Sequence, residues 1–256
     1  MTDVGMGVVY EQFMLNRFFE RIVKEHGIST ALEAPVYGMA VFTGINSIGL
    51  ARLGVDVTLL DTDKERLEIA KQAWEIAKTR ARFVYSEKTG KLPFRDDEFD
   101  FAYNFAALWH VEDADKLLDE IARVSSNVVL ICMPNPWNPG FLIRNAFNKL
   151  PKGKRWADQK RIEQKLRGNG MEIIESGVID VPPWPDSEVP VKKILGGFGI
   201  KLGKKKWRWS ILDYYSGKNP GIRKKAERYA FIEDSRLPAA LKRLWAHHFY
   251  ILAKKQ

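Results

Sequence analysis

The sequence predicts an α/β fold in which one largely parallel sheet of seven strands has helices on both faces. The first observation is an alternation between residues 30 and 133, where apolar segments of strand character are separated by segments with helical spacing. Such alternation is typical of parallel strands joined by crossover helices. The second observation is that two more strand-like segments, residues 171–181 and 248–253, come later in the chain. Together these segments give seven strands in one core.

Each element follows from its local periodicity and from the residues that end it. Residues 8–25 have apolar side chains at mostly helical spacing, and Gly27 ends this first helix. The strands of the alternating region are expected at residues 30–34, 55–60, 82–85, 100–105 and 127–133. The helices between and after these strands are expected at residues 45–53, 64–78, 115–124 and 158–167.

Composition limits the class of protein. The 256 residues are 45% hydrophobic and 29% charged, which is ordinary for a folded domain. The longest apolar runs are too short to cross a bilayer, and an acidic N-terminal region without a basic start does not predict a secretory signal. The single cysteine, Cys132, and four histidines give no metal-ligand spacing, so no metal site is expected. We therefore expect a cytoplasmic protein without a transmembrane helix.

The strongest local signal is the segment from residue 31 to residue 61. A strand ends in Glu33, a loop with Gly38 and Gly44 follows, and a helix then leads into a second strand that ends in Asp61. Ligands of parallel sheets bind at the carboxyl ends of the strands. Glycines let backbone amides approach a ligand, and an acid after the second strand accepts hydrogen bonds from ribose hydroxyls. The segment therefore predicts a cofactor that contains a nucleoside.

Three segments carry a resemblance to a known family. Residues 43–57 read TGINSIGLARLGVDV, residues 92–113 read LPFRDDEFDFAYNFAALWHVED, and residues 248–255 read HFYILAKK. They resemble the motifs of class I S-adenosylmethionine-dependent methyltransferases, a Rossmann-like family. The resemblance implies an antiparallel last strand, and an enzyme that transfers a methyl group from S-adenosylmethionine to an acceptor left unidentified. The chain departs from the family in its glycine loop, which is lengthened between Glu33 and Gly44.

The resemblance also implies roles for individual residues. The cofactor would be bound by residues at the ends of the first four strands and in the loops that follow them: Glu33, Pro35, Gly38, Gly44, Asp61, Glu87, Asn104 and Phe105. Among these, Glu33 is expected near the amino acid end of the cofactor, Asp61 at the ribose, and Phe105 near the methyl group. The weak candidates for a general base are His110 and Tyr37.

The net charge of +9 is concentrated in one region. Residues 186–244 contain 15 lysines and arginines and 6 acidic residues. Because this region lies between the sixth and seventh strands, we interpret it as an insertion into a methyltransferase core formed by residues 1–185 and 245–256. Its basic and aromatic run, which would bind the substrate or another anion, is Lys204, Lys205, Lys206, Trp207 and Arg208. We rank three interpretations of this composition: a lid over a small-molecule or anionic substrate comes first, contact with RNA second, and contact with an anionic membrane third. The alternative to all three is a solvated charged surface.

Two alternatives to a methyltransferase come from other classes. The altered loop and the basic insertion fit a non-catalytic nucleic-acid-binding protein built on a methyltransferase-like scaffold. A nicotinamide-dependent oxidoreductase fits less well, because no G-x-G-x-x-G turn follows the first strand.

Overall fold

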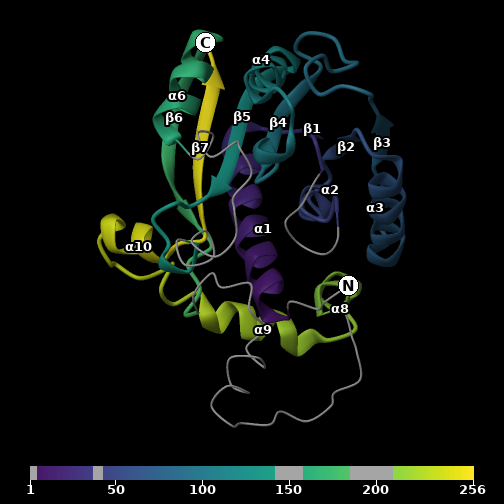
Figure 1. Ribbon diagram of the computed structural model, residues 1–256. Helices are drawn as coiled ribbons and strands as arrows, with labels where there is room; N and C mark the ends of the chain where they lie inside the picture. The colour runs from purple at the N-terminus through teal and green to yellow at the C-terminus, as the bar shows by residue number, and fades with distance from the viewer. Residues whose placement is uncertain (1–4, 37–42, 142–157, 185–209) are drawn as a thin grey trace.

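The computed structural model describes residues 5–36, 43–141, 158–184 and 210–256. Its centre is a seven-stranded sheet with the order β3-β2-β1-β4-β5-β7-β6 (Figure 1). The strands are β1 Thr30–Glu33, β2 Asp56–Asp61, β3 Arg82–Tyr85, β4 Phe99–Phe105, β5 Ser125–Pro134, β6 Met171–Ile179 and β7 His248–Lys255. The strands β1 to β5 pair in parallel, whereas β7 is antiparallel to both β5 and β6. The predicted seven-stranded fold with an antiparallel last strand is therefore confirmed.

The register places the ends of several strands at one edge of the sheet. Glu33 pairs with Leu59 and Tyr103, so the carboxyl ends of β1, β2 and β4 lie together. At the other half of the sheet, His248 begins β7 opposite Pro134 of β5 and beside the end of β6. The start of the antiparallel strand thus joins the edge at which the parallel strands finish.

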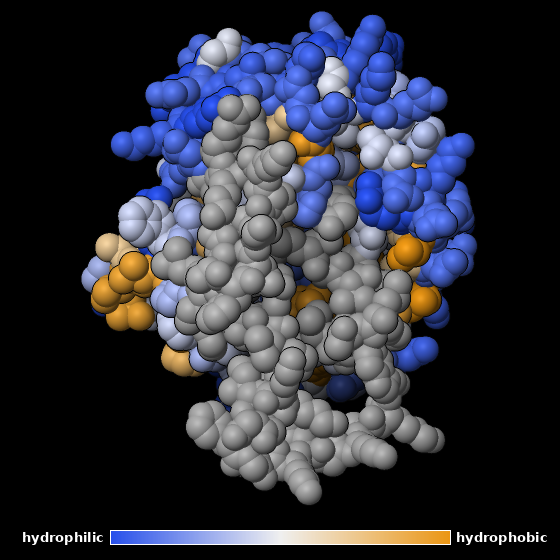
Figure 2. Space-filling model, in the orientation of Figure 1, coloured by the Kyte–Doolittle hydropathy of each residue, from blue (hydrophilic) through white to orange (hydrophobic). Residues whose placement is uncertain are grey.

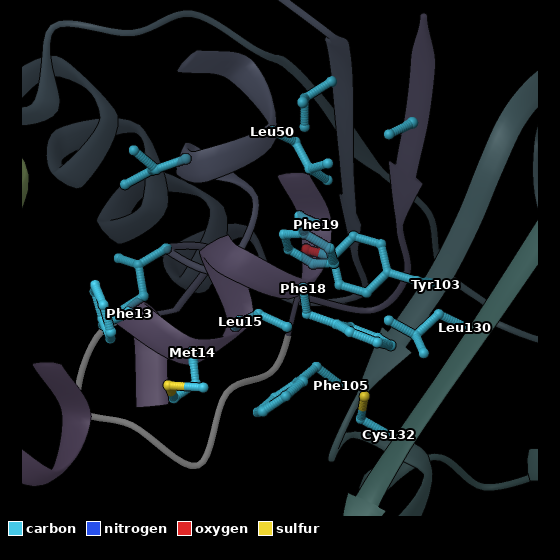
Figure 3. Close-up of a cluster of buried hydrophobic side chains, with 14 of the residues drawn as sticks. Phe13, Met14, Leu15, Phe18, Phe19, Leu50, Tyr103, Phe105, Leu130 and Cys132 are labelled. Carbon is cyan, nitrogen blue, oxygen red and sulfur yellow. The ribbon is translucent and has the colours of Figure 1, made fainter. Parts of the chain in front are cut away.

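One face of the sheet is covered by the N-terminal helix and its neighbours. These are α1 Met6–His26, α2 Ile48–Arg52 and α3 Lys64–Ala77. Strand alternation directs every second side chain of β4 toward α1, where Phe19 packs against the rings of Phe101 and Tyr103. Figure 3 shows Phe18, Phe19 and Phe105 filling the space between this helix and the strands. The helix expected at residues 45–53 is shorter in the structure, because residues 43–47 form turns.

The other face is covered by α4 Ala114–Val124 and α6 Gln159–Gly168, and the short 3-10 helix η1 Leu108–His110 follows β4. Both α-helices begin where an aspartate side chain accepts backbone N–H groups, from Lys116 for α4 and from Lys160 for α6. Such caps satisfy donors that the first helical turn leaves unpaired. Their apolar residues form a second core with the opposite faces of the strands.

The basic region contributes helices that the sequence analysis did not place. They are α8 Ser210–Ser216, α9 Pro220–Tyr229 and α10 Ala239–Trp245, and α8 and α9 lie across the lower end of α1 in Figure 1. Ile211, Tyr215 and Ile222 are buried in the same core as α1, so this part of the region packs on the core. The division at residues 186 and 244 stays a prediction.

An apolar patch lies on the surface at α10. Figure 2 shows it at the side of the molecule that α10 occupies, where Leu241 and Leu244 are about half exposed. Among the helices of the described ranges, none is long and apolar enough to cross a membrane.

Candidate functional site

The carboxyl end of β1 holds a buried carboxylate whose oxygens are bonded to the protein itself. The side chain of Glu33 accepts hydrogen bonds from Asn46 Nδ2 at 3.0 Å, Ser47 Oγ at 2.6 Å and the Tyr103 hydroxyl at 2.8 Å. Burial raises the pKa of Glu33, although these three hydrogen bonds oppose the rise. Glu33 therefore joins β1 to β4 and to the turn before α2. Its predicted contact with a cofactor stays a prediction.

The hydrogen bonds continue from Glu33 into the basic region. Asn46 accepts a bond from Gln12 Nε2 at 2.7 Å, and Gln12 Oε1 accepts one from the Tyr215 hydroxyl at 2.9 Å. All four side chains are buried. A continuous polar chain therefore connects α8 of the basic region through α1 to the end of β1.

The carboxyl end of β2 holds a second buried carboxylate, and this one is only half satisfied. Asp61 Oδ1 accepts hydrogen bonds from Arg66 Nε at 3.0 Å and from the backbone N–H of Asp63 at 2.8 Å. Asp61 Oδ2 is buried and has no hydrogen-bond partner among the residues that the structure describes. Because buried acceptors in native proteins are almost always paired, this oxygen is placed to accept a bond from a ligand.

Between these two carboxylates, the ends of the glycine loop are fixed. The Ala34–Pro35 peptide is cis, and the next N–H, from Val36, donates to Leu60 O at 3.0 Å. At the other end Gly44 has φ +71°, and a Cβ there would lie 2.8 Å from Ala70 Cβ. Only glycine fits this position without displacing α3. Tyr37 and Gly38, two of the predicted site residues, lie outside the described residues.

The exit from β4 is bonded to the start of the glycine loop. Asn104 Nδ2 donates to Ala34 O at 2.8 Å, while Asn104 Oδ1 accepts from the Ala107 N–H at 3.1 Å. Asn104 therefore ties β4 to the start of the loop after β1. The next residue, Phe105, is buried, and its ring centroid lies 4.8 Å from that of His248.

The remaining predicted residues lie further out or outside the described ranges. Glu87 is exposed in the segment after β3. His110 is exposed at the end of η1, and its pKa is lowered by partial burial and by the Arg66 guanidinium. Residues 204–208, the predicted anion-binding run, lie outside the part of the chain that the structure describes.

A buried polar cluster at the same edge was missed by the sequence analysis. Glu11 of α1, Asp180 after β6 and His248 at the start of β7 each offer a ligand atom, and these atoms lie within 4.8 Å of one another. Burial raises the pKa of Glu11 to about 7. Burial also acts to raise the pKa of Asp180, but His247 and His248 lower it below its usual value. The only signal in the sequence is that Asp180 and the paired histidines stand at strand ends.

A separate cavity lies on the α6 side of the sheet. It has a volume of about 650 Å³ and is lined among others by Trp137, Gln159, Arg243 and Phe249. Phe249 follows His248 in β7 and so points to the opposite face of the sheet. None of the predicted cofactor residues that the structure describes lines this cavity, which is therefore separate from the carboxyl ends of β1, β2 and β4.

Comparison with known proteins agrees with this geometry. A family model described as "Methyltransferase domain" matches residues 38–131. O-methyltransferase resE of Aspergillus sclerotiorum is 26% identical over 166 residues, which cover 61% of this chain and 62% of that protein. The chain thus matches less than two thirds of this curated relative's length.

Solved structures show the same fold at low identity. Magnesium protoporphyrin IX methyltransferase from Synechocystis PCC 6803, with bound SAM, is 13% identical with a TM-score of 0.53, covering 97% of this chain and 81% of that chain. The [4+2]-cyclase SpnF is 15% identical with a TM-score of 0.53, covering 94% and 80%. This chain has the Rossmann-like fold of the class I methyltransferases. Its residues 38–131 are similar to the methyltransferase domain model, in agreement with the motifs at residues 43–57 and 92–113.

Proposed function

We propose that the protein transfers a methyl group from S-adenosylmethionine to a small-molecule acceptor. The observation that carries this proposal is the buried, unpartnered Oδ2 atom of Asp61 at the carboxyl end of β2. That is the position at which Rossmann-like folds bind the ribose of a nucleotide cofactor. Fold alone does not define activity, and one neighbour of the same fold is described as a cyclase. The matched methyltransferase domain supports the enzyme over the nucleic-acid-binding alternative.

The residues at this edge fit the cofactor. Asp61 Oδ2 would accept a hydrogen bond from a ribose hydroxyl, while Arg66 holds the other oxygen of the carboxylate. The two fixed ends of the loop, at Pro35 and Gly44, would border the methionine part. Phe105 would lie beside the methyl group. In this assignment Glu33 acts on the cofactor by shaping the loop, because its oxygens already accept three protein hydrogen bonds.

The bound cofactor supplies an activated methyl group, so the protein has to position the acceptor and exclude water. The aromatic residues buried between α1 and β4 form the apolar core behind the end of β4. The relative in Aspergillus is an O-methyltransferase by name, and we favour an oxygen acceptor on that ground. In the same proposal residues 186–244 form a lid or substrate region, which α8 joins to the end of β1 through Tyr215, Gln12 and Asn46.

Binding of S-adenosylhomocysteine, measured by calorimetry, tests this proposal. We expect wild-type protein to bind it and Asp61→Ala to bind at least roughly tenfold more weakly, because a hydrogen bond to a charged group contributes about 1.5–3 kcal/mol. Asp56→Asn is the matched control, since Asp56 is the exposed residue at the opposite end of the same strand. Folded wild-type protein that does not bind S-adenosylhomocysteine would contradict the proposal.

A further inference from the structure

We propose that Glu11, Asp180 and His248 form a binding site for a divalent metal ion of the Zn²⁺, Co²⁺ or Mn²⁺ type. The three side chains come from α1, from the residue that follows β6 and from the first residue of β7. Their ligand atoms lie within 4.8 Å of one another. Two carboxylates and one imidazole form a donor set that suits these borderline ions.

The spacing of the donors matches a metal site. Asp180 Oδ2 lies 3.6 Å from His248 Nδ1. Two ligands bonded at about 2.1 Å to one tetrahedral ion lie roughly 3.4 Å apart, so this pair is already close to bonding geometry. The ligand atom of Glu11 lies within 4.8 Å of the other two, so it needs to move inward by at most about 1.5 Å to complete the set.

The second observation is that Asp180 and His248 are buried and that each keeps a polar atom without a partner. Asp180 and His248 are each 2% exposed. Asp180 Oδ1 and His248 Nε2 have no hydrogen-bond partner within the described ranges, while Asp180 Oδ2 faces the imidazoles of His247 and His248 at 3.0 and 3.6 Å. Leaving one buried polar group unpaired costs about 1–3 kcal/mol, and more for a charged one. A cation between them would satisfy the carboxylate and the imidazole together, and its charge would balance the two acids.

The surrounding residues hold Asp180 in place. Asp180 has φ +65°, a left-handed conformation that is unusual outside glycine. It is maintained by Glu233, whose carboxylate accepts the backbone N–H groups of Asp180 at 3.1 Å and Val181 at 3.0 Å. His247 Nδ1 lies 3.0 Å from Asp180 Oδ2. Outer contacts of this kind orient the ligands of metal sites.

The place of the site suggests its use. Glu11 is only partly buried and gives an ion access from solvent. His248 packs against Phe105, the residue expected beside the transferred methyl group. Three protein ligands leave coordination positions open, and an acceptor oxygen bound there would ionise at lower pH. This use rests on the proposed function, whereas the binding of the metal does not.

Cobalt binding tests the site directly. An untagged chain, purified with chelator, is titrated with Co²⁺ while its visible d–d absorption is followed, and bound metal is then measured after gel filtration. We expect about one Co²⁺ per chain. His248→Gln and Asp180→Asn should weaken binding by at least roughly 100-fold, and His247→Gln by about tenfold, as for an outer contact. Asparagine tolerates the left-handed conformation of residue 180, so Asp180→Asn should fold.

The chain has four histidines, and those outside the cluster give the controls. His26→Gln and His110→Gln should bind Co²⁺ like the wild type. Absence of Co²⁺ binding to folded wild-type protein, or binding unchanged in both His248→Gln and Asp180→Asn, would overturn the proposal. S-adenosylhomocysteine calorimetry on the same samples separates the two proposals, because cofactor binding without metal binding would refute only the metal site.

Discussion

Two buried carboxylate groups lie at the same edge of the sheet, and they are satisfied in opposite ways. Glu33 accepts three side-chain hydrogen bonds and connects to Gln12 and Tyr215 through Asn46. Asp180, in contrast, has one oxygen, Oδ1, without a hydrogen-bond partner in the described part of the chain, and its Oδ2 faces the imidazoles of His247 and His248. The first carboxylate is completed by the fold, whereas the second needs a ligand. The comparison shows that burial of an acid alone does not separate a structural role from a binding role, whereas its hydrogen-bond partners do.

The largest expected effect comes from removing the satisfied carboxylate. Glu33→Ala removes the shared acceptor of three buried donors, on Asn46, Ser47 and Tyr103, so we expect a loss of about 4 kcal/mol in the free energy of unfolding. Urea denaturation measures it. Glu172→Ala, which removes an exposed acid from β6, should change stability by less than about 0.5 kcal/mol. If Glu33→Ala kept wild-type stability but lost S-adenosylhomocysteine binding, the carboxylate of Glu33 would have a ligand-binding role instead of a structural one.

The next effect tests whether the loop beside Glu33 is held by packing. Gly44→Ala forces a side chain into a left-handed conformation and against Ala70, which together cost about 3 kcal/mol. Gly54→Ala is the matched control, because Gly54 also has positive φ, at +86°, but has open space around its Cβ position. It should cost only about 1 kcal/mol. Equal losses in the two variants, measured by thermal or urea unfolding, would show that packing against α3 adds nothing.

The carboxylate of Asp180, as part of the proposed metal site, predicts that a bound metal ion stabilises the folded protein. Zn²⁺ at 100 times its dissociation constant should raise the free energy of unfolding by about 2.7 kcal/mol, because the ion binds the folded state. Differential scanning calorimetry with and without Zn²⁺ measures the change. The increase should vanish in His248→Gln and persist in His110→Gln. An equal increase in both variants would place the ion elsewhere on the chain.

The smallest effect concerns a carboxylate that is satisfied by a cation. Burial alone would raise the pKa of Glu120, but hydrogen bonds from Arg123 and from the backbone of Leu92 lower it below its usual value of 4.5. Its contribution is therefore present above about pH 4.5 and is lost as the pH falls through the lower folded-state value. Glu120→Gln should remove about 1 kcal/mol or less at pH 7. The difference in the free energy of unfolding between Glu120→Gln and wild type should shrink in acid. Urea unfolding at several pH values measures it, and a difference that grows in acid would contradict the prediction.

Much of the fold followed from the sequence, because strand and helix periods are local properties. The alternation between residues 30 and 133 predicted β1 to β5, and the strand ending in Asp61 was placed correctly. The helices α8 and α9 were not predicted, since their charged composition hides the few apolar residues, such as Ile211 and Ile222, that pack on α1. The partners of Glu33 were not predicted either. Tyr103 approaches it only because β1 and β4 are adjacent in the sheet.

The sequence by itself determined which strands end in acids and where histidines stand, and it gave no spacing typical of a metal site. Only the tertiary structure decided that Glu11, Asp180 and His248 meet. The physical reason is the antiparallel insertion of β7 between β5 and β6, which sets its first residue beside the end of β6. The packing of α1 across the sheet then brings Glu11 to the same point. These are long-range contacts, and no local pattern encodes them.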